Sequence, residues 1–179
     1  MKRSDLEHIL RAASAITKQM RFLVVGSQAI VGTVPEPTGA LGMSMEADLC
    51  PIDDPSVTDL IDGAIGESSP FHETFGYYAQ GVGVETAVLP NGWAQRVNRV
   101  LDPVSQAEGL CIDPADLAAS KLVAWREKDR PFIEALLGQR IIDLQTLRAR
   151  VRDLAADRLA RYGLDHDQLL ARLNRLSNR

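Results

Sequence analysis

Cysteine and histidine are scarce in this sequence, and their scarcity excludes several classes of protein. The two cysteines, Cys50 and Cys111, are too few for a disulfide scaffold and form no CxxC motif. We therefore expect a reducing cytoplasmic location, with each thiol buried as a small hydrophobic group. The three histidines are scattered along the chain, which argues against a zinc site. No Ser-His-Asp order typical of a hydrolase is legible either.

Long apolar runs are also missing. No run approaches the roughly 20 residues that a transmembrane helix requires, so we expect no role in a membrane. Residues 1–16 include acids and carry apolar residues at helical spacing, which predicts a helix rather than a secretion signal. With 179 residues, 45% of them hydrophobic and 25% charged, the chain can bury the core of one globular domain, with or without a small appendage.

Charge is distributed unevenly along the chain. Residues 1–139 hold 11 Lys+Arg and 19 Asp+Glu, a net charge of −8, whereas residues 140–179 hold 9 Arg and 5 Asp, a net charge of +4. An arginine-rich segment can bind phosphate groups, and it can equally be the solvated face of helices. The sequence leaves both interpretations open.

The spacing of apolar residues predicts an α+β fold. We expect strands over residues 21–25, 43–52, 75–80, 81–89 and 109–113. We expect helices over residues 4–19, 55–65, 113–128, 129–137, 143–161 and 166–176, with a short helix directly after Gly26. Residues 66–71 are predicted as a polar loop, and residues 92–101 are ambiguous between strand and helix. The predicted architecture is a mixed β-sheet with flanking helices over residues 1–140, with a helical C-terminal segment, 141–179, packed on it.

Two acids in the second predicted strand are candidate metal ligands. Side chains alternate along a strand, so Glu46 and Asp48 point the same way, about 7 Å apart. Such a pair is tolerated at an exposed edge, and it is useful around a cation. Mg²⁺ prefers oxygen ligands and usually takes one or two protein carboxylates together with substrate phosphates. The pair therefore predicts a site for Mg²⁺, or for Mn²⁺ in its place.

A third acid lies in the stretch GVGVETAVL, residues 81–89. If this stretch is a strand, Glu85 is the sole acid on a face that it shares with Gly83 and Ala87. Glu85 is then either a third carboxylate near the pair or a solvated surface acid. Gly26-Ser27 forms a further candidate element, because a glycine between a strand and a helix lets phosphate approach the first N–H groups of that helix.

A lysine falls within the apolar stripe of the helix predicted over residues 113–128. Lys121 lies four residues from both Leu117 and Trp125. Its ammonium group either reaches water past its packed stem or neutralises a triphosphate in a cleft. Lys128 follows seven residues later and would lie on nearly the same face of this helix as Lys121. Asp129 can cap the next helix, pair with Lys121, or contact substrate.

These elements together resemble the polymerase-β-like nucleotidyltransferase superfamily. Its pattern is a hydrophobic strand ending in Gly-Gly or Gly-Ser, an acid-x-acid strand and a later third carboxylate, and VVGS, MEADL and VETAV fit it. The segments DPADLAASKLVAWREKD and LPNGWAQRV resemble a family of small bacterial nucleotidyltransferase-like proteins. That family is related to abortive-infection and toxin–antitoxin nucleotidyltransferases. The resemblance spans roughly residues 20–140.

The resemblance implies a set of roles. Gly26, Ser27, Lys121, Lys128 and Asp129 would bind the nucleotide. Glu46, Asp48 and Glu85 would be the catalytic carboxylates that hold the metal, with Lys121 as a further catalytic residue. The implied reaction is metal-dependent transfer of a nucleoside monophosphate from an NTP to a hydroxyl of an RNA, with tRNA as one candidate, or of a protein.

Three functional interpretations remain open from the sequence. The first is an active nucleotidyltransferase, with a role as the toxin of a toxin–antitoxin or phage-defence system and a cognate antitoxin as partner. The second is a catalytically silent relative that binds a nucleotide or a protein. Glutamate at positions 46 and 85 favours the second class, since the superfamily most often has aspartate at the corresponding positions. A module that acts only through its C-terminal helices is a third interpretation.

Overall fold

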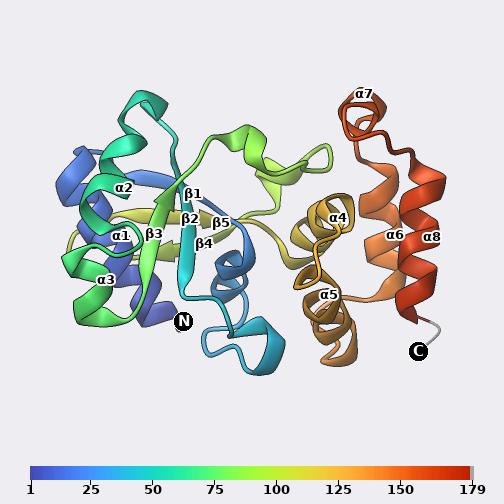
Figure 1. The fold of residues 1–179 in the computed structure, drawn as a ribbon, viewed down its shortest axis with the longest axis horizontal. Helices are drawn as coiled ribbons and strands as arrows, with labels where there is room; N and C mark the ends of the chain where they lie inside the picture. Colours follow the sequence, from blue (N-terminus) through green and yellow to red (C-terminus); the bar gives the residue numbers. More distant parts are fainter. Residues whose placement is uncertain (178–179) are drawn as a thin grey trace. The chain divides into compact units, whose positions relative to one another are not determined.

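The computed structural model describes residues 1–177, which form two compact units (Figure 1). The first unit comprises residues 1–86 and 97–113, and the second comprises residues 87–96 and the chain from residue 114 onward. The sequence placed the division at residue 140 instead. The difference arises because the helices that begin at residues 114 and 129 pack with the C-terminal helices.

A five-stranded mixed sheet forms the centre of the first unit. Its strands are β1 (Arg21–Val25), β2 (Glu46–Pro51), β3 (Tyr78–Gly81), β4 (Asn98–Leu101) and β5 (Glu108–Cys111), in the order β3-β2-β1-β5-β4. Strand β1 is antiparallel to β2 and parallel to β5, and β2 is parallel to β3. With its flanking helices, this sheet confirms the predicted α+β fold class.

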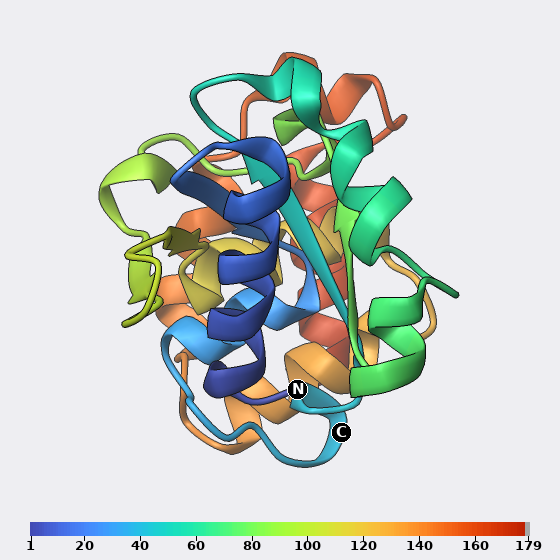
Figure 2. The same cartoon turned by 90° about the vertical axis from the view of Figure 1, so that its left-hand side faces the viewer.

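Three helices of the first unit lie on one face of this sheet. They are α1 (Arg3–Thr17), α2 (Asp59–Ile65) and α3 (Pro70–Phe75), and Figure 2 shows α1 in front of the strands. A Cβ added at Gly109 of β5 would lie 3.0 Å from Leu10 of α1 and 3.2 Å from Val24 of β1. Helix α1 therefore approaches the sheet closely where β5 has no side chain. Its buried residues are those that the helical spacing predicts, Leu6, Ile9, Leu10 and Ala13.

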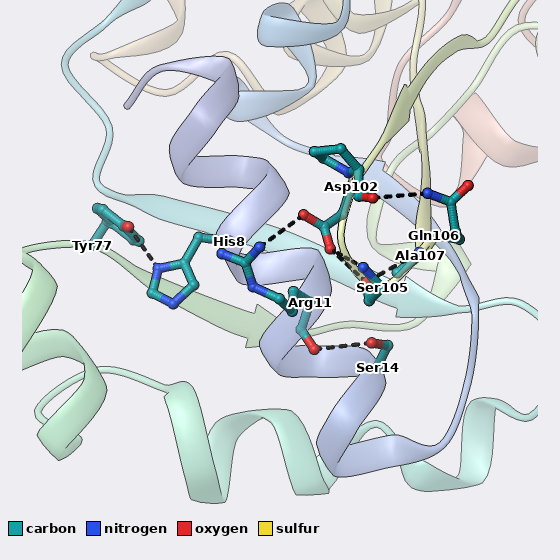
Figure 3. A network of polar contacts seen from close by, with 9 residues as sticks. His8, Arg11, Ser14, Tyr77, Asp102, Ser105, Gln106 and Ala107 are labelled. Carbon is teal, nitrogen blue, oxygen red and sulfur yellow. Dashed lines mark hydrogen bonds and ion pairs between the residues drawn. The ribbon is translucent and has the colours of Figure 1, made fainter.

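A polar network fastens α1 to the turn between β4 and β5 (Figure 3). Arg11 donates to the buried carboxylate of Asp102 at 3.2 Å, and Ser105 donates to it from its N–H at 2.7 Å and its hydroxyl at 2.6 Å. Burial raises the pKa of Asp102, but the Ser105 hydrogen bonds and the Arg11 charge outweigh it and hold the pKa below its usual value. On the same helix, His8 Nδ1 lies 2.9 Å from the Tyr77 hydroxyl.

Helices make up most of the second unit. They are α4 (Pro114–Ala124), α5 (Asp129–Gly138), α6 (Leu144–Arg152), α7 (Ala156–Ala160) and α8 (His166–Ser177). Helix α4 contacts α5, α6 and α8, and almost all of its residues are buried. It is therefore the central helix of this unit.

A buried carboxylate joins three segments of the second unit. Asp116 of α4 has no exposed surface. It accepts from Arg96 Nε at 2.9 Å and Arg96 Nη2 at 3.0 Å, and Arg150 Nε of α6 lies 3.0 Å from it. Arg96 lies in segment 87–96, so this arrangement explains why that segment belongs with the helices rather than with the sheet.

Several predicted boundaries were wrong. The helix predicted over residues 113–128 ends at Ala124, because Trp125 takes a left-handed conformation with φ +52°. The helix predicted over 143–161 is broken, since the Asp153 carbonyl accepts from Asn91 rather than from the next turn. Helix α3 lies in a stretch that begins in the predicted loop, where Ser69 caps its first turn. The ambiguous residues 92–101 end in strand β4.

Candidate active site

Gly26 directly follows β1 in a backbone conformation that favours glycine. Its φ of 66° and ψ of −167° lie in a region that other residues avoid. A Cβ built at this position would also overlap the carboxylate of Asp48. Two physical reasons thus favour glycine at this position. The second reason also shows that the Asp48 carboxylate lies against the corner between β1 and the 3₁₀ helix η1 (Ser27–Gly32).

Glu46 and Asp48 share one face of β2, as predicted. Both are half-buried, and the intervening Ala47 is fully buried on the opposite face. Asp48 is in register with Val25 of β1 and with Gln80 of β3, and Glu46 is in register with Tyr78. Because β2 is antiparallel to β1, both acids lie at the edge of the sheet where β1 ends and Gly26-Ser27 begins. This edge is the candidate active site of the first unit.

Tyr78 lies beside both carboxylates and is not among the residues predicted for the site. Burial raises the pKa of its phenol first, followed by the negative charges of Glu46, Glu67 and Asp48. The ring of His72 packs on it, with centroids 4.6 Å apart. Tyr78 joins the site because β3 pairs with β2, and a single sequence does not reveal which strands pair.

A buried amide links η1 to the same strand. Gln28 has no exposed surface, and its Nε2 donates to the Ser44 carbonyl at 2.6 Å. The Ser44 hydroxyl in turn lies 3.3 Å from the Glu46 N–H and 3.2 Å from the Glu46 carbonyl. Gln28 therefore fixes the start of β2 relative to η1. Its buried Oε1 has no hydrogen-bond partner among the described residues.

Glu85 does not lie on a strand, which corrects the prediction for residues 81–89. The backbone of residues 45 and 49 faces β3, since their carbonyls accept from Tyr78 and Val82. The next residue of β2 that faces β3 is Pro51, which has no N–H to donate, so the ladder stops. Beyond it the chain forms a 3₁₀ turn over Val84–Thr86. Glu85 is exposed there, and its carboxylate folds back over Gly83.

The three predicted metal carboxylates are consequently not gathered in this structure. Within residues 1–177, no three His, Cys, Asp or Glu side chains lie close enough together to hold a metal ion. Glu46 and Asp48 remain as a pair. A carboxylate pair is a donor set that suits Mg²⁺, because this ion usually takes one or two protein carboxylates and completes its shell with water and substrate phosphates. The residues present therefore fit Mg²⁺, without Glu85.

The other predicted nucleotide-binding residues belong to the second unit. Lys121 Nζ donates to Asp129 Oδ1 at 3.0 Å and lies 4.5 Å from the centroid of the Phe132 ring. Burial lowers the pKa of Lys121, and Asp129 counteracts this. Of the open alternatives for Asp129, the structure shows the pairing with Lys121, whereas the N-cap position of α5 is taken by Lys128. Asp129 also accepts a hydrogen bond from the Arg126 N–H at 2.9 Å. Lys128 is exposed between α4 and α5.

The two units differ strongly in charge. Counted over the whole sequence, the first unit carries 6 Lys+Arg and 15 Asp+Glu, a net charge of −9. The second carries 14 Lys+Arg and 9 Asp+Glu, a net charge of +5. The acidic unit holds the candidate site and would attract cations, whereas the basic unit would attract polyanions.

Residues 4–168 match the model of a family described as nucleotidyltransferase of unknown function (DUF6036). The chain belongs to this family. Comparisons with curated proteins and with solved structures gave no match. Membership of the family supports a general nucleotidyltransferase activity, and this agrees with a carboxylate pair on one strand face, of which Asp48 lies against the glycine corner. No helix among the described residues is long and apolar enough to cross a membrane.

Proposed function

We propose that this chain is a Mg²⁺-dependent nucleotidyltransferase that moves a nucleoside monophosphate from an NTP to a hydroxyl group of an RNA or a protein, with tRNA as one candidate acceptor. The observation that carries the proposal is the position of the Asp48 carboxylate against Gly26, on the strand face that Glu46 shares. Mn²⁺ is the alternative ion, since it also prefers oxygen ligands.

Each side chain of the edge has a role in the proposed reaction. Glu46 and Asp48 would hold the metal ion, which neutralises phosphate charge when bound. Gly26 and Ser27 would receive the triphosphate, because glycine leaves space beside the backbone and serine supplies a hydroxyl donor. Tyr78 and Gln28 would position Glu46. The acceptor oxygen attacks the α-phosphorus, the bond to pyrophosphate breaks, and the hydroxyl proton is released.

A direct experiment tests this activity. The purified chain is incubated with Mg²⁺, labelled NTPs and total tRNA or protein acceptors. We expect label transfer that is lost in Asp48→Ala and retained in Asp59→Ala, an exposed acid of α2 in the same unit. Circular dichroism of each variant controls for folding. Absence of transfer to every acceptor, together with absence of metal-dependent NTP binding, would refute the proposal.

The alternative function is a nucleotidyltransferase-like protein that binds a nucleotide or a protein without catalysis. The position of Glu85 favours it, because Glu85 is exposed in a 3₁₀ turn and two of the three predicted metal carboxylates, Glu46 and Asp48, remain together on β2. This alternative predicts metal-dependent NTP binding without label transfer. A toxin role with a cognate antitoxin is a further proposal, and growth arrest on expression that requires Asp48 would support it.

A further inference from the structure

The second unit places two arginines against one tryptophan, and a third arginine lies near one of these two. The guanidinium carbon of Arg130 lies 5.0 Å from the centroid of the Trp125 ring, and that of Arg172 lies 5.3 Å from it. Arg175 is close enough for its charge, with that of Arg130, to lower the pKa of Arg172, after burial as the main cause. We call Trp125, Arg130, Arg172 and Arg175 the Trp125 cluster.

Local structure accounts for one arginine of the cluster and leaves two unexplained. Arg172 donates to the carbonyls of Leu122 at 2.6 Å and Val123 at 3.0 Å, so it caps the C-terminus of α4. Arg130 and Arg175 are exposed, and neither forms an ion pair with any described residue. Three like charges repel one another, which lowers stability unless a polyanion offsets them.

The backbone at Trp125 adds a second observation. Its φ of +52° is a left-handed conformation that a bulky residue rarely adopts and that glycine normally supplies after a helix. A tryptophan held there, with strain of order 1–3 kcal/mol, indicates that its indole is used for something other than ending α4. The indole holds two guanidinium groups within cation–π distance at a half-exposed site.

We propose that the Trp125 cluster binds the phosphate backbone of a single-stranded nucleic acid. Arginine recognises phosphate with parallel N–H donors, and its planar group also stacks on unpaired bases. A double helix keeps its bases stacked inside, so it would engage the charges and leave the stacking planes unused. The net charge of +5 on this unit attracts such a strand. As the docking site of an acceptor strand the cluster rests on the proposed transferase function, but its binding is measured without catalysis.

Charge reversal at the two unexplained arginines tests the proposal, with a matched control. Binding of labelled single-stranded RNA and DNA oligonucleotides to the full chain is followed by fluorescence anisotropy through a salt titration. We expect Arg130→Glu/Arg175→Glu to weaken binding about tenfold or more. Losing two phosphate contacts should make the slope of log K against log salt shallower by about 1.4. The control, Arg158→Glu/Arg161→Glu, alters two exposed arginines at α7 by the same charge and should change affinity less than about threefold.

Tryptophan fluorescence gives a second, local measurement. Trp93→Phe leaves Trp125 as the sole tryptophan, and its emission should change when the strand binds. Trp125→Phe leaves Trp93 and should show no such change. Binding of RNA alone, or of RNA and DNA equally, supports the proposal. Equal loss in both arginine pairs, an unresponsive Trp125, or no strand binding at low salt would overturn it. Metal-dependent NTP binding is measured in the same variants and should be unchanged. Absence of strand binding by the unmodified chain, with intact NTP binding, would overturn the role of the Trp125 cluster and leave the proposed transferase function standing.

Discussion

Substitution of Gly26 by alanine tests the geometry of the candidate site. The backbone at Gly26 has φ 66° and ψ −167°, and placing a residue with a Cβ there costs of order 1–3 kcal/mol. For a chain of this length, that loss corresponds to a fall in Tm of roughly 2–12 °C. The new methyl group would also overlap the Asp48 carboxylate, which adds to the loss. Thermal and urea unfolding, followed by circular dichroism, measure both effects together.

A double-mutant cycle separates the two contributions. In an Asp48→Ala background the overlap disappears and only the backbone contribution remains, so Gly26→Ala should destabilise less by about 0.5–3 kcal/mol. Gly63→Ala is the matched control, because Gly63 lies in α2 where an added Cβ meets no atom. It should be neutral or stabilising by up to about 1 kcal/mol. If Gly26→Ala behaves like Gly63→Ala, or has the same effect in both backgrounds, the inferred contact between the glycine and the carboxylate is wrong.

Three further predictions concern buried charges and thiols. Lys121→Ala should lower the free energy of unfolding by about 3–5 kcal/mol, because Asp129 would remain buried without its charged partner. Urea unfolding checks this, and a loss below about 1 kcal/mol would contradict it. Asp116→Ala should lower it by a similar amount by stranding Arg96 and Arg150, and Asp157→Ala, an exposed acid of α7, should change it by under about 0.5 kcal/mol. Burial raises the pKa of the Cys111 thiol to about 12 from its ordinary 9.0. Above about pH 9 the thiol therefore loses its proton in the unfolded chain before it does so in the folded chain, and the free energy of unfolding should fall as pH rises. The fall should be steeper than in Cys111→Ala by up to about 1.4 kcal/mol per pH unit. Equal pH slopes in the two proteins would refute the raised pKa of Cys111.

Local patterns predicted much of the first unit and the helices of the second. Strands β1 and β2 follow from short apolar runs that end at Gly26 and Pro51, and α1 follows from apolar residues at helical spacing. Helix α3 also had a local signal that was missed, since Ser69-Pro70 is a serine cap followed by proline at the first helical position.

Other features depend on contacts between distant residues. The valines of residues 81–89 alternate as in a strand, but Pro51, some thirty positions earlier, has no N–H with which to continue the ladder. The early end of α4 at Ala124 depends on Trp125, which lies against Arg130 and Arg172. The division into units follows from Asp116 and its two arginines, which come from segments 20 and 34 positions away. Apart from Arg130, which is only five positions from Trp125, these partners lie outside any local window.

The residues of the candidate site likewise fall into those predicted by local patterns and those placed by contacts between distant segments. That Glu46 and Asp48 share a face is a property of one strand, so the sequence predicts it. The role of Gly26 is also local, since a glycine between strand and helix is a recognisable signal. Tyr78 and Gln28 join the site only through strand pairing and a loop contact. Glu85 was predicted as a metal ligand from the strand-like alternation of residues 81–89, but in the folded chain it lies in a 3₁₀ turn.

Binding of an NTP in the presence and absence of Mg²⁺ tests the central claim most directly. Isothermal titration calorimetry would compare the unmodified chain with Asp48→Asn and Glu85→Gln, each with unchanged circular dichroism. Because Asp48 lies against the glycine corner and Glu85 is exposed in a separate turn, Mg²⁺-dependent affinity should fall about tenfold or more in Asp48→Asn and stay unchanged in Glu85→Gln. Affinity that is independent of Mg²⁺, or that falls equally in both variants, would contradict the assignment of the Glu46–Asp48 edge as the metal and nucleotide site.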